Sequence, residues 1–264
     1  MLGKLLAHGG FRPHIPAVRR VVFLSLLLLA WLGAFWLGRS AGSRAPRASR
    51  PPDPTPDETT ATAAAVAVFK DSLRAARARL LKAIAERDTY LPAMLVESDS
   101  LVRRWPERVA RPIRVYLPEP AISGYTVAMG LAVENAFARW ERVGGIPVSF
   151  SVVRDSAAVD VQVRWVDAFQ FERAGQADVV WDRQGWVVHG TLTLATHTFR
   201  GHPLSADAVQ TVALHEIGHL LGLGHSDDPR DVMYASTEVH DLTLRDRQTA
   251  QLLYALPPGS LRLP

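Results

Sequence analysis

Three histidines and a glutamate in residues 212–236 have a spacing that suits a metal ion. His215, Glu216, His219, Gly222 and His225 fit the pattern H-E-x-x-H-x-x-G-x-x-H. On a helix, positions i and i+4 share one face, so His215 and His219 would direct two imidazoles at one ion. Gly222 tolerates the positive φ that ends a helix in a sharp turn, and such a turn would bring His225 back as the third ligand.

The donor set indicates which metal and which reaction. Three neutral imidazole nitrogens at about 2.0–2.1 Å suit Zn²⁺, with a fourth position open for water. Glu216 neighbours a ligand but faces another direction, so it would contact that water rather than the metal. It would then act as the general base of a metal-assisted hydrolysis. The alternative is a buried helix whose histidines are ordinary core groups with satisfied hydrogen bonds.

A methionine completes a wider pattern, because seven residues separate His225 from Met233. These residues resemble the metzincin metallopeptidases, whose signature is the long zinc motif followed by a methionine turn. Ser226 and the D-V-M-Y turn resemble the matrixin branch most. The resemblance implies peptidase activity, one catalytic Zn²⁺ and an apolar floor formed by Met233 beneath the histidines. Matrixins are typically held inactive by a pro-segment cysteine, and this chain has no cysteine.

The elements expected around the motif predict an α+β fold. Alternating apolar residues predict strands near 113–117, 148–153, 159–165 and 187–195. Helical spacing predicts helices over 129–140, from 205 or 207 to 221, and from 242 onward. Ser205 or Asp207 would cap the second of these helices, and Thr243 with Asp246 has capping-box spacing. A metzincin-like zinc-peptidase domain, with a twisted mixed sheet, two long helices and a C-terminal helix, fits this order over residues 105–264.

One strand is expected to bind substrate. By the same resemblance, residues 175–181 form the edge strand beside the cleft, where unpaired backbone groups would hold an extended peptide. Residues 187–194 are the competing edge strand, and an ordinary shielded strand is the other alternative. The candidate substrate contacts are Gly175, Gln176, Ala177, Asp178 and Tyr234. Tyr234 directly follows Met233 and is not assigned to the metal.

No second metal site is evident from the sequence. Asp227, Asp228 and Asp231 could hold Ca²⁺, but solvated turns explain them equally well. Four further histidines lie in the same region, and each is expected to be an isolated surface or strand residue: His189, His197, His202 and His240.

The amino-terminal third has a different composition. Residues 21–38 form an uncharged apolar run about 27 Å long as a helix, which predicts a single transmembrane signal-anchor behind a short basic segment, residues 1–20. A cleaved signal peptide, which would give a secreted protein, is the alternative. Four basic residues on each side leave the orientation balanced, with a slight preference for an extracytoplasmic catalytic domain.

Two segments join this anchor to the motif-bearing domain. Residues 39–62 are rich in Pro and Ala and predict a linker. Residues 63–104 are expected to be an amphipathic helical stalk or pro-segment, because apolar residues recur at helical spacing over 66–84. The apolar face of this helix could pack on the catalytic domain, pair with another copy of the chain, or act as an inhibitory pro-segment.

These features favour a membrane-anchored zinc endopeptidase that cuts extended polypeptides outside the cytoplasm. A catalytically silent zinc-binding interaction module is the alternative, although zinc ligation alone would not require Glu216. A regulatory membrane protein that works through its amphipathic helix is the third candidate. The net charge is only +4 and no stretch alternates basic with aromatic residues, which argues against a nucleic-acid partner.

Overall fold

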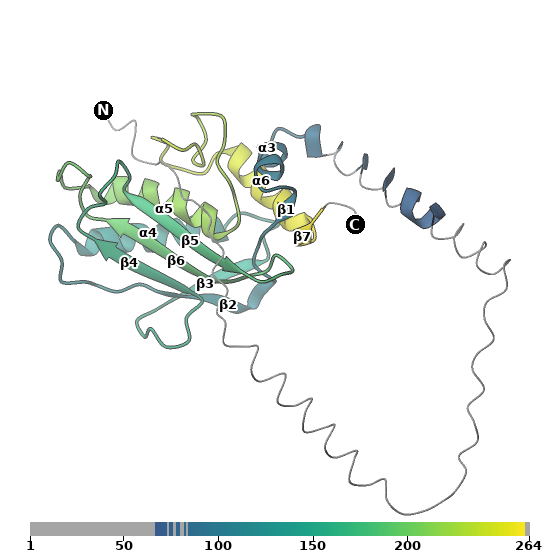
Figure 1. Ribbon diagram of the computed structural model, residues 1–264. Coiled ribbons are helices and arrows are strands. Elements are labelled where there is room, and N and C mark those ends of the chain that lie inside the picture. The colour runs from purple at the N-terminus through teal and green to yellow at the C-terminus, as the bar shows by residue number, and fades with distance from the viewer. Residues whose placement is uncertain (1–66, 73, 76–77, 80–81, 83, 262–264) are drawn as a thin grey trace, which may run out of the picture. The chain divides into compact units, whose positions relative to one another are not determined.

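The computed structural model describes residues 67–72, 74–75, 78–79, 82 and 84–261 (Figure 1). Residues from 74 onward belong to one compact unit, the main unit below, and residues 67–72 belong to a second. The predicted transmembrane helix, residues 21–38, lies outside the described residues, as do segments 1–20 and 39–62. In the described part of the chain, no helix has the length and apolar character needed to cross a membrane.

A five-stranded mixed sheet forms the centre of the main unit, which agrees with the predicted α+β class. Its strands stand in the order β3-β2-β4-β6-β5, with β5 antiparallel to β6 and the other neighbours parallel. The strands are β2 (Arg108–Tyr116), β3 (Val148–Val153), β4 (Val161–Val166), β5 (Gly175–Trp181) and β6 (Val187–Ala195). β6 lies between β4 and β5, so residues 175–181, and not 187–194, form the edge of the sheet.

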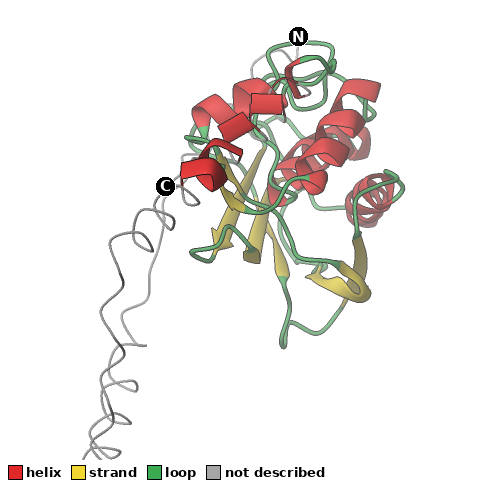
Figure 2. Ribbon diagram, turned by 90° about the vertical axis from the view of Figure 1, so that its right-hand side faces the viewer, coloured by secondary structure: helices red, strands yellow, loops and turns green. Residues whose placement is uncertain are grey.

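Two long helices pack beside each other and against this sheet (Figure 2). α4 spans Val127–Glu141 and α5 spans Ala206–Leu220. The Trp140 indole is fully buried between them and donates a hydrogen bond to the Leu214 carbonyl oxygen at 2.8 Å. α5 contacts both β5 and β6, so the helix that carries the histidines lies directly along the sheet edge.

The described residues between 74 and 104 are part of this main unit. α3 (Leu91–Glu97) packs on α6 (Leu244–Ala255), and β1 (Leu101–Val102) pairs antiparallel with β7 (Gly259–Ser260). Six apolar side chains of this segment are at most 7% exposed: Ile84, Tyr90, Leu91, Met94, Leu95 and Val102. The packing therefore extends the domain back to Ile84, whereas the sequence analysis began it at residue 105.

The expected amphipathic helix over residues 66–84 is helical wherever it is described. Val68 is 69% exposed and Phe69 is 63% exposed, and of the described side chains in this stretch Ile84 is the buried one. Self-association or inhibition through residues 66–84 stays a prediction.

Candidate metal centre

α5 begins at a side-chain cap and presents the first two histidines four residues apart. The Ser205 hydroxyl accepts a hydrogen bond from the Ala208 N–H at 3.1 Å, which decides between the two caps that the sequence offered. Asp207 lies in the first turn, where its charge favours the helix dipole. His215 is 1% exposed and His219 is partly buried.

Gly222 makes the turn that follows α5. Its φ is +101°, and a Cβ atom built there would lie 2.0 Å from the carbonyl oxygen of Arg103. Both the left-handed backbone and this close approach require glycine. The Leu223 N–H returns to the Gly218 carbonyl oxygen at 3.0 Å, and the chain then reverses to bring His225 to the other two histidines.

The three histidines converge on one place, and the first two have the spacing of ligands on a tetrahedral ion. The Nε2 atoms of His215 and His219 lie 3.1 Å apart, and one ring nitrogen from each of His215, His219 and His225 lies within 4.8 Å of the others. Two ligand nitrogens on a tetrahedral Zn²⁺ are about 3.3 Å apart, given Zn–N distances of about 2.0–2.1 Å. Among the residues that the structure describes, no other group of three or more potential metal ligands comes this close together.

Backbone carbonyl groups orient two of the rings. The Nδ1 of His215 lies 2.8 Å from the Val232 oxygen, and the Nδ1 of His219 lies 2.8 Å from the Leu223 oxygen. A carbonyl oxygen can only accept, so each Nδ1 carries the hydrogen and each Nε2 keeps its lone pair for a metal.

Electrostatics keep these two imidazoles in the neutral form that ligates metals. Burial, followed by the neighbouring histidines, lowers the pKa of His215 well below its ordinary value. Burial and His225 lower the pKa of His219 to about 4. The chemistry and geometry of the donor set therefore fit zinc.

Glu216 faces the edge strand. A Cβ atom built on Gly175 of β5 would lie 2.9 Å from the Glu216 Oε1, so glycine is what lets the carboxylate lie against the strand. Burial raises the pKa of Glu216 to about 8, while the positive charge of Arg173 and the Ala177 N–H act in the opposite direction. A cation beside a carboxylate favours its ionised form.

Met233 lies fully buried beneath α5. A Cβ atom built on Gly218 would lie 2.3 Å from the Met233 Sδ, so the methionine packs where α5 has no side chain. Asp246 fixes the backbone of this turn, because its carboxylate accepts hydrogen bonds from the Val232 N–H at 3.0 Å and the Met233 N–H at 3.4 Å. Asp246 also closes the predicted capping box of α6 with Thr243.

The aspartates after His225 are paired with arginines. Arg245 bonds Asp231 at 2.6 Å and Asp227 at 2.7 Å, and Arg230 bonds Asp228 at 2.6 Å. These carboxylates therefore hold the loop together, and nothing in this arrangement favours the Ca²⁺ interpretation.

The five candidate substrate contacts divide into two places. Gly175, Gln176, Ala177 and Asp178 follow one another on β5, next to Glu216, whereas Tyr234 lies partly buried in the turn after the methionine. The Gln176 amide bonds the Asp178 carboxylate at 3.0 Å. Substrate contact at these positions stays a prediction.

The four other histidines that the structure describes do not join the cluster. His197 pairs with Asp167 at 2.8 Å, and the His240 Nδ1 lies 2.8 Å from the Thr211 hydroxyl. His189 is a β6 residue and His202 is exposed.

The sequence analysis missed two contributions to the site. Arg173 places a positive charge near Glu216, but it precedes the strand without any motif that would mark it. The α3 segment packs on the histidine turn, and the apolar spacing of Leu91, Met94 and Leu95 was a signal that could have found it.

Comparisons with known proteins agree with this geometry. The sequence profile of the Peptidase_M10 family, described as matrixin, matches residues 123–255. Metalloendoproteinase 1 of Glycine max is 27% identical over 180 residues, covering 59% of this chain and 54% of that protein. Metalloendoproteinase 1-MMP of Arabidopsis thaliana is 33% identical over 142 residues, covering 49% of this chain and 38% of that protein. A probable matrix metalloproteinase of Invertebrate iridescent virus 3 is 27% identical over 158 residues, covering 51% of this chain and 39% of that protein. The chain spans about half the length of these relatives, or less.

Proposed function

The chain belongs to the matrixin family, and from this premise we propose that it is a zinc-dependent endopeptidase acting on extended polypeptides. One observation carries the proposal. His215, His219 and His225 converge within 4.8 Å, and the buried Glu216, the residue after His215, lies against the edge strand β5. An interaction module that only held a metal would have no need of a carboxylate there.

Each residue has a task in this reaction. Zinc held by the three histidines would polarise the substrate carbonyl group and acidify water at its open position. Glu216 would accept the proton of the attacking water at a carboxylate oxygen and pass it to the leaving amine. Met233 would support the histidine rings from below without taking part in proton transfer.

The substrate main chain would add a strand to β5. β6 pairs with one side of β5, and no strand among the described residues pairs with its other side. The Ala177 N–H already reaches Glu216. Backbone groups of Gly175, Gln176, Ala177 and Asp178 would hold the peptide in register, as in β-augmentation. Tyr234 would contribute to the wall of the cleft.

The place of action follows from the amino-terminal composition. The apolar run 21–38 supports an anchor in the bilayer, or a secreted protein if that run is cleaved. The extracytoplasmic side of the peptidase domain rests on the slight preference of the charges before that run.

A digestion assay tests the proposal. The full chain, its Glu216→Ala variant and a Glu238→Ala control, which removes an exposed glutamate of the same domain, would each be incubated with an unfolded protein. Fragments would be identified by mass spectrometry, and zinc per chain would be measured in all three preparations.

Removal of the general base should lower the rate by about 100-fold or more, while zinc content and the control stay unchanged. Zinc in all three proteins without cleavage in any would contradict the peptidase proposal and favour the silent zinc-binding module.

A further inference from the structure

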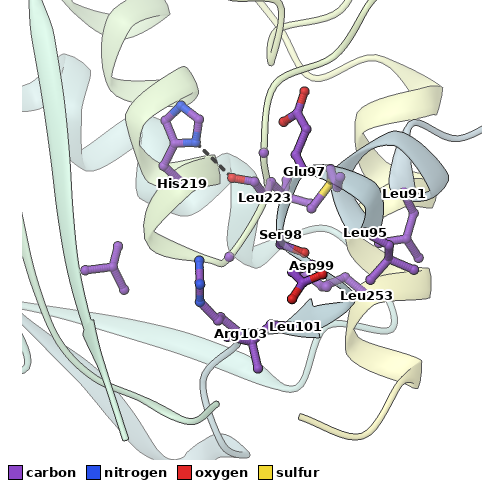
Figure 3. Close-up of a pocket in the computed structure, with 14 residues that line it drawn as sticks. Leu91, Leu95, Glu97, Ser98, Asp99, Leu101, Arg103, His219, Leu223 and Leu253 are labelled. Atoms are coloured by element: carbon purple, nitrogen blue, oxygen red, sulfur yellow. Dashed lines mark hydrogen bonds between the residues drawn. The ribbon is translucent and has the colours of Figure 1, made fainter. Parts of the chain in front are cut away.

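A pocket of about 400 Å³ adjoins the candidate metal centre (Figure 3). His219, the Gly222–Gly224 turn and Val179 of β5 form one side of it. The opposite side comes from α3 and the turn after it, and the floor is apolar; we call it the α3 pocket. The α3 side is lined by Leu91, Met94, Leu95, Glu97, Ser98 and Asp99.

The wall made by α3 is packed directly on the histidine turn. A Cβ atom built on Gly224 would lie 3.1 Å from the Met94 Cγ, and the Arg103 carbonyl oxygen covers Gly222. The Arg103 guanidinium lies 4.0 Å from the centre of the Trp181 ring of β5. The segment before residue 105 thus joins the end of β5 to the turn that positions the metal ligands.

The α3 side of the pocket lies outside the residues that the family profile matches. The family profile begins at residue 123, whereas α3 and β1 lie between residues 91 and 102. The α3 pocket therefore combines the metal-site turn with a segment that the profile does not cover.

The course of β5 determines what reaches the pocket. Ala177 reaches Glu216, and Val179 lies two residues further along the same strand at the pocket wall. A peptide paired with β5 advances about 7 Å over two residues, and its side chains alternate between faces. A substrate side chain would therefore arrive at the pocket about two or three residues from the bond next to Glu216.

We propose that the α3 pocket is a specificity subsite that binds one large apolar side chain of the substrate polypeptide, on one side of the cleaved bond. This inference rests on the proposed endopeptidase function and adds to it a substrate preference set by residues 91–103. The apolar floor supplies the burial, and the volume lies within the usual range of ligand pockets.

The test uses the full chain and a variant that fills the pocket. Ser98 caps the end of α3 with an ordinary negative φ of −86° and lines the pocket, so Ser98→Phe adds a ring there. Val96→Phe is the matched control, because Val96 is 81% exposed on the same helix and does not line the pocket. Each protein would digest a degenerate peptide library, and residue preferences at every position around the cleaved bond would be read by mass spectrometry.

The wild type and Val96→Phe should share a preference for large apolar residues at one position two or three residues from the cleaved bond. Ser98→Phe should reduce cleavage of peptides with Leu or Phe at that position at least tenfold, and should cleave peptides with Ala there as the wild type does. An unchanged profile in Ser98→Phe, or an equal loss for all peptides, would overturn the proposal.

Binding separates this inference from the proposed function. The same library would be captured on Glu216→Ala and on the double variant with Ser98→Phe. If Glu216→Ala retains peptides rich in large apolar residues and the double variant does not, the result supports the pocket as a binding site for those side chains. This holds even if the wild type cleaves no peptide. Equal retention by both proteins contradicts the pocket, whatever the cleavage assay shows.

Discussion

Deletion of the residues before 105 should unfold the domain rather than free it. A fragment of residues 105–264 contains the whole zinc motif, and the sequence analysis identified it as the peptidase domain. The structure instead buries six apolar side chains of residues 84–102 against the main unit. A fragment of residues 82–264 retains all of them and serves as the matched control.

The size of the effect follows from this burial. Full burial of a large apolar side chain contributes about 1.5–3 kcal/mol, so six contribute about 9 kcal/mol at the lower figure. A domain of this kind is stable by about 5–15 kcal/mol in total. The shorter fragment would also lose the hydrogen bond from the Tyr90 hydroxyl to the buried Asp246, which is 3.1 Å long. Most or all of its stability is therefore removed.

Urea denaturation followed by circular dichroism measures the difference. The 82–264 fragment should unfold in one cooperative transition, whereas the 105–264 fragment should show none or a midpoint near zero denaturant. A 105–264 fragment with the same midpoint and zinc content as the longer one would refute the assignment of residues 84–104 to the domain.

Three substitutions test the packing around the metal site. Gly222→Ala should lower the zinc content and reduce the stability of the domain by more than the about 1–3 kcal/mol typical of a strained backbone, because the new Cβ atom also meets a carbonyl oxygen. Gly201→Ala is the control, since Gly201 has a φ of +80° and open space around it, so this variant measures the backbone cost alone. Equal urea midpoints for the two variants would refute the clash. Gly218→Ala should destabilise the domain by about 1–3 kcal/mol, because the new methyl group overlaps Met233, and an unchanged midpoint would contradict that contact. Asp246→Ala should reduce the stability by about 3 kcal/mol or more, because the Val232, Met233 and Thr243 N–H groups lose their hydrogen-bond acceptor. An unchanged Tm in thermal unfolding would show that other contacts hold this turn.

The strands and helices of the family-matched region were predictable because their local signals agree with the fold. Apolar residues over 148–153 and 187–195 predicted the bounds that the structure has for β3 and β6, and the family resemblance predicted those of β5, residues 175–181. The ligand set was predictable because helical spacing and one glycine turn dictate it. The choice of edge strand came from the family resemblance and not from local patterns, because sheet order depends on pairing between distant residues.

The contribution of α3 was hidden for a physical reason. Residues 91–97 are a short helix whose apolar side chains acquire meaning only when α6 and the Gly224 turn cover them. Composition alone therefore grouped them with the preceding stalk. Arg173 likewise affects Glu216 only through folding, since the two lie 43 residues apart in the chain.

The most direct test of the central claim is the zinc content and coordination of the full chain. X-ray absorption should find one zinc per chain with three nitrogen ligands at about 2.0–2.1 Å. His225→Ala should lose most of this zinc, and His202→Ala, which removes an exposed histidine outside the cluster, should keep it. A wild type that binds no zinc, or a His225→Ala variant that binds zinc as the wild type does, would contradict the account.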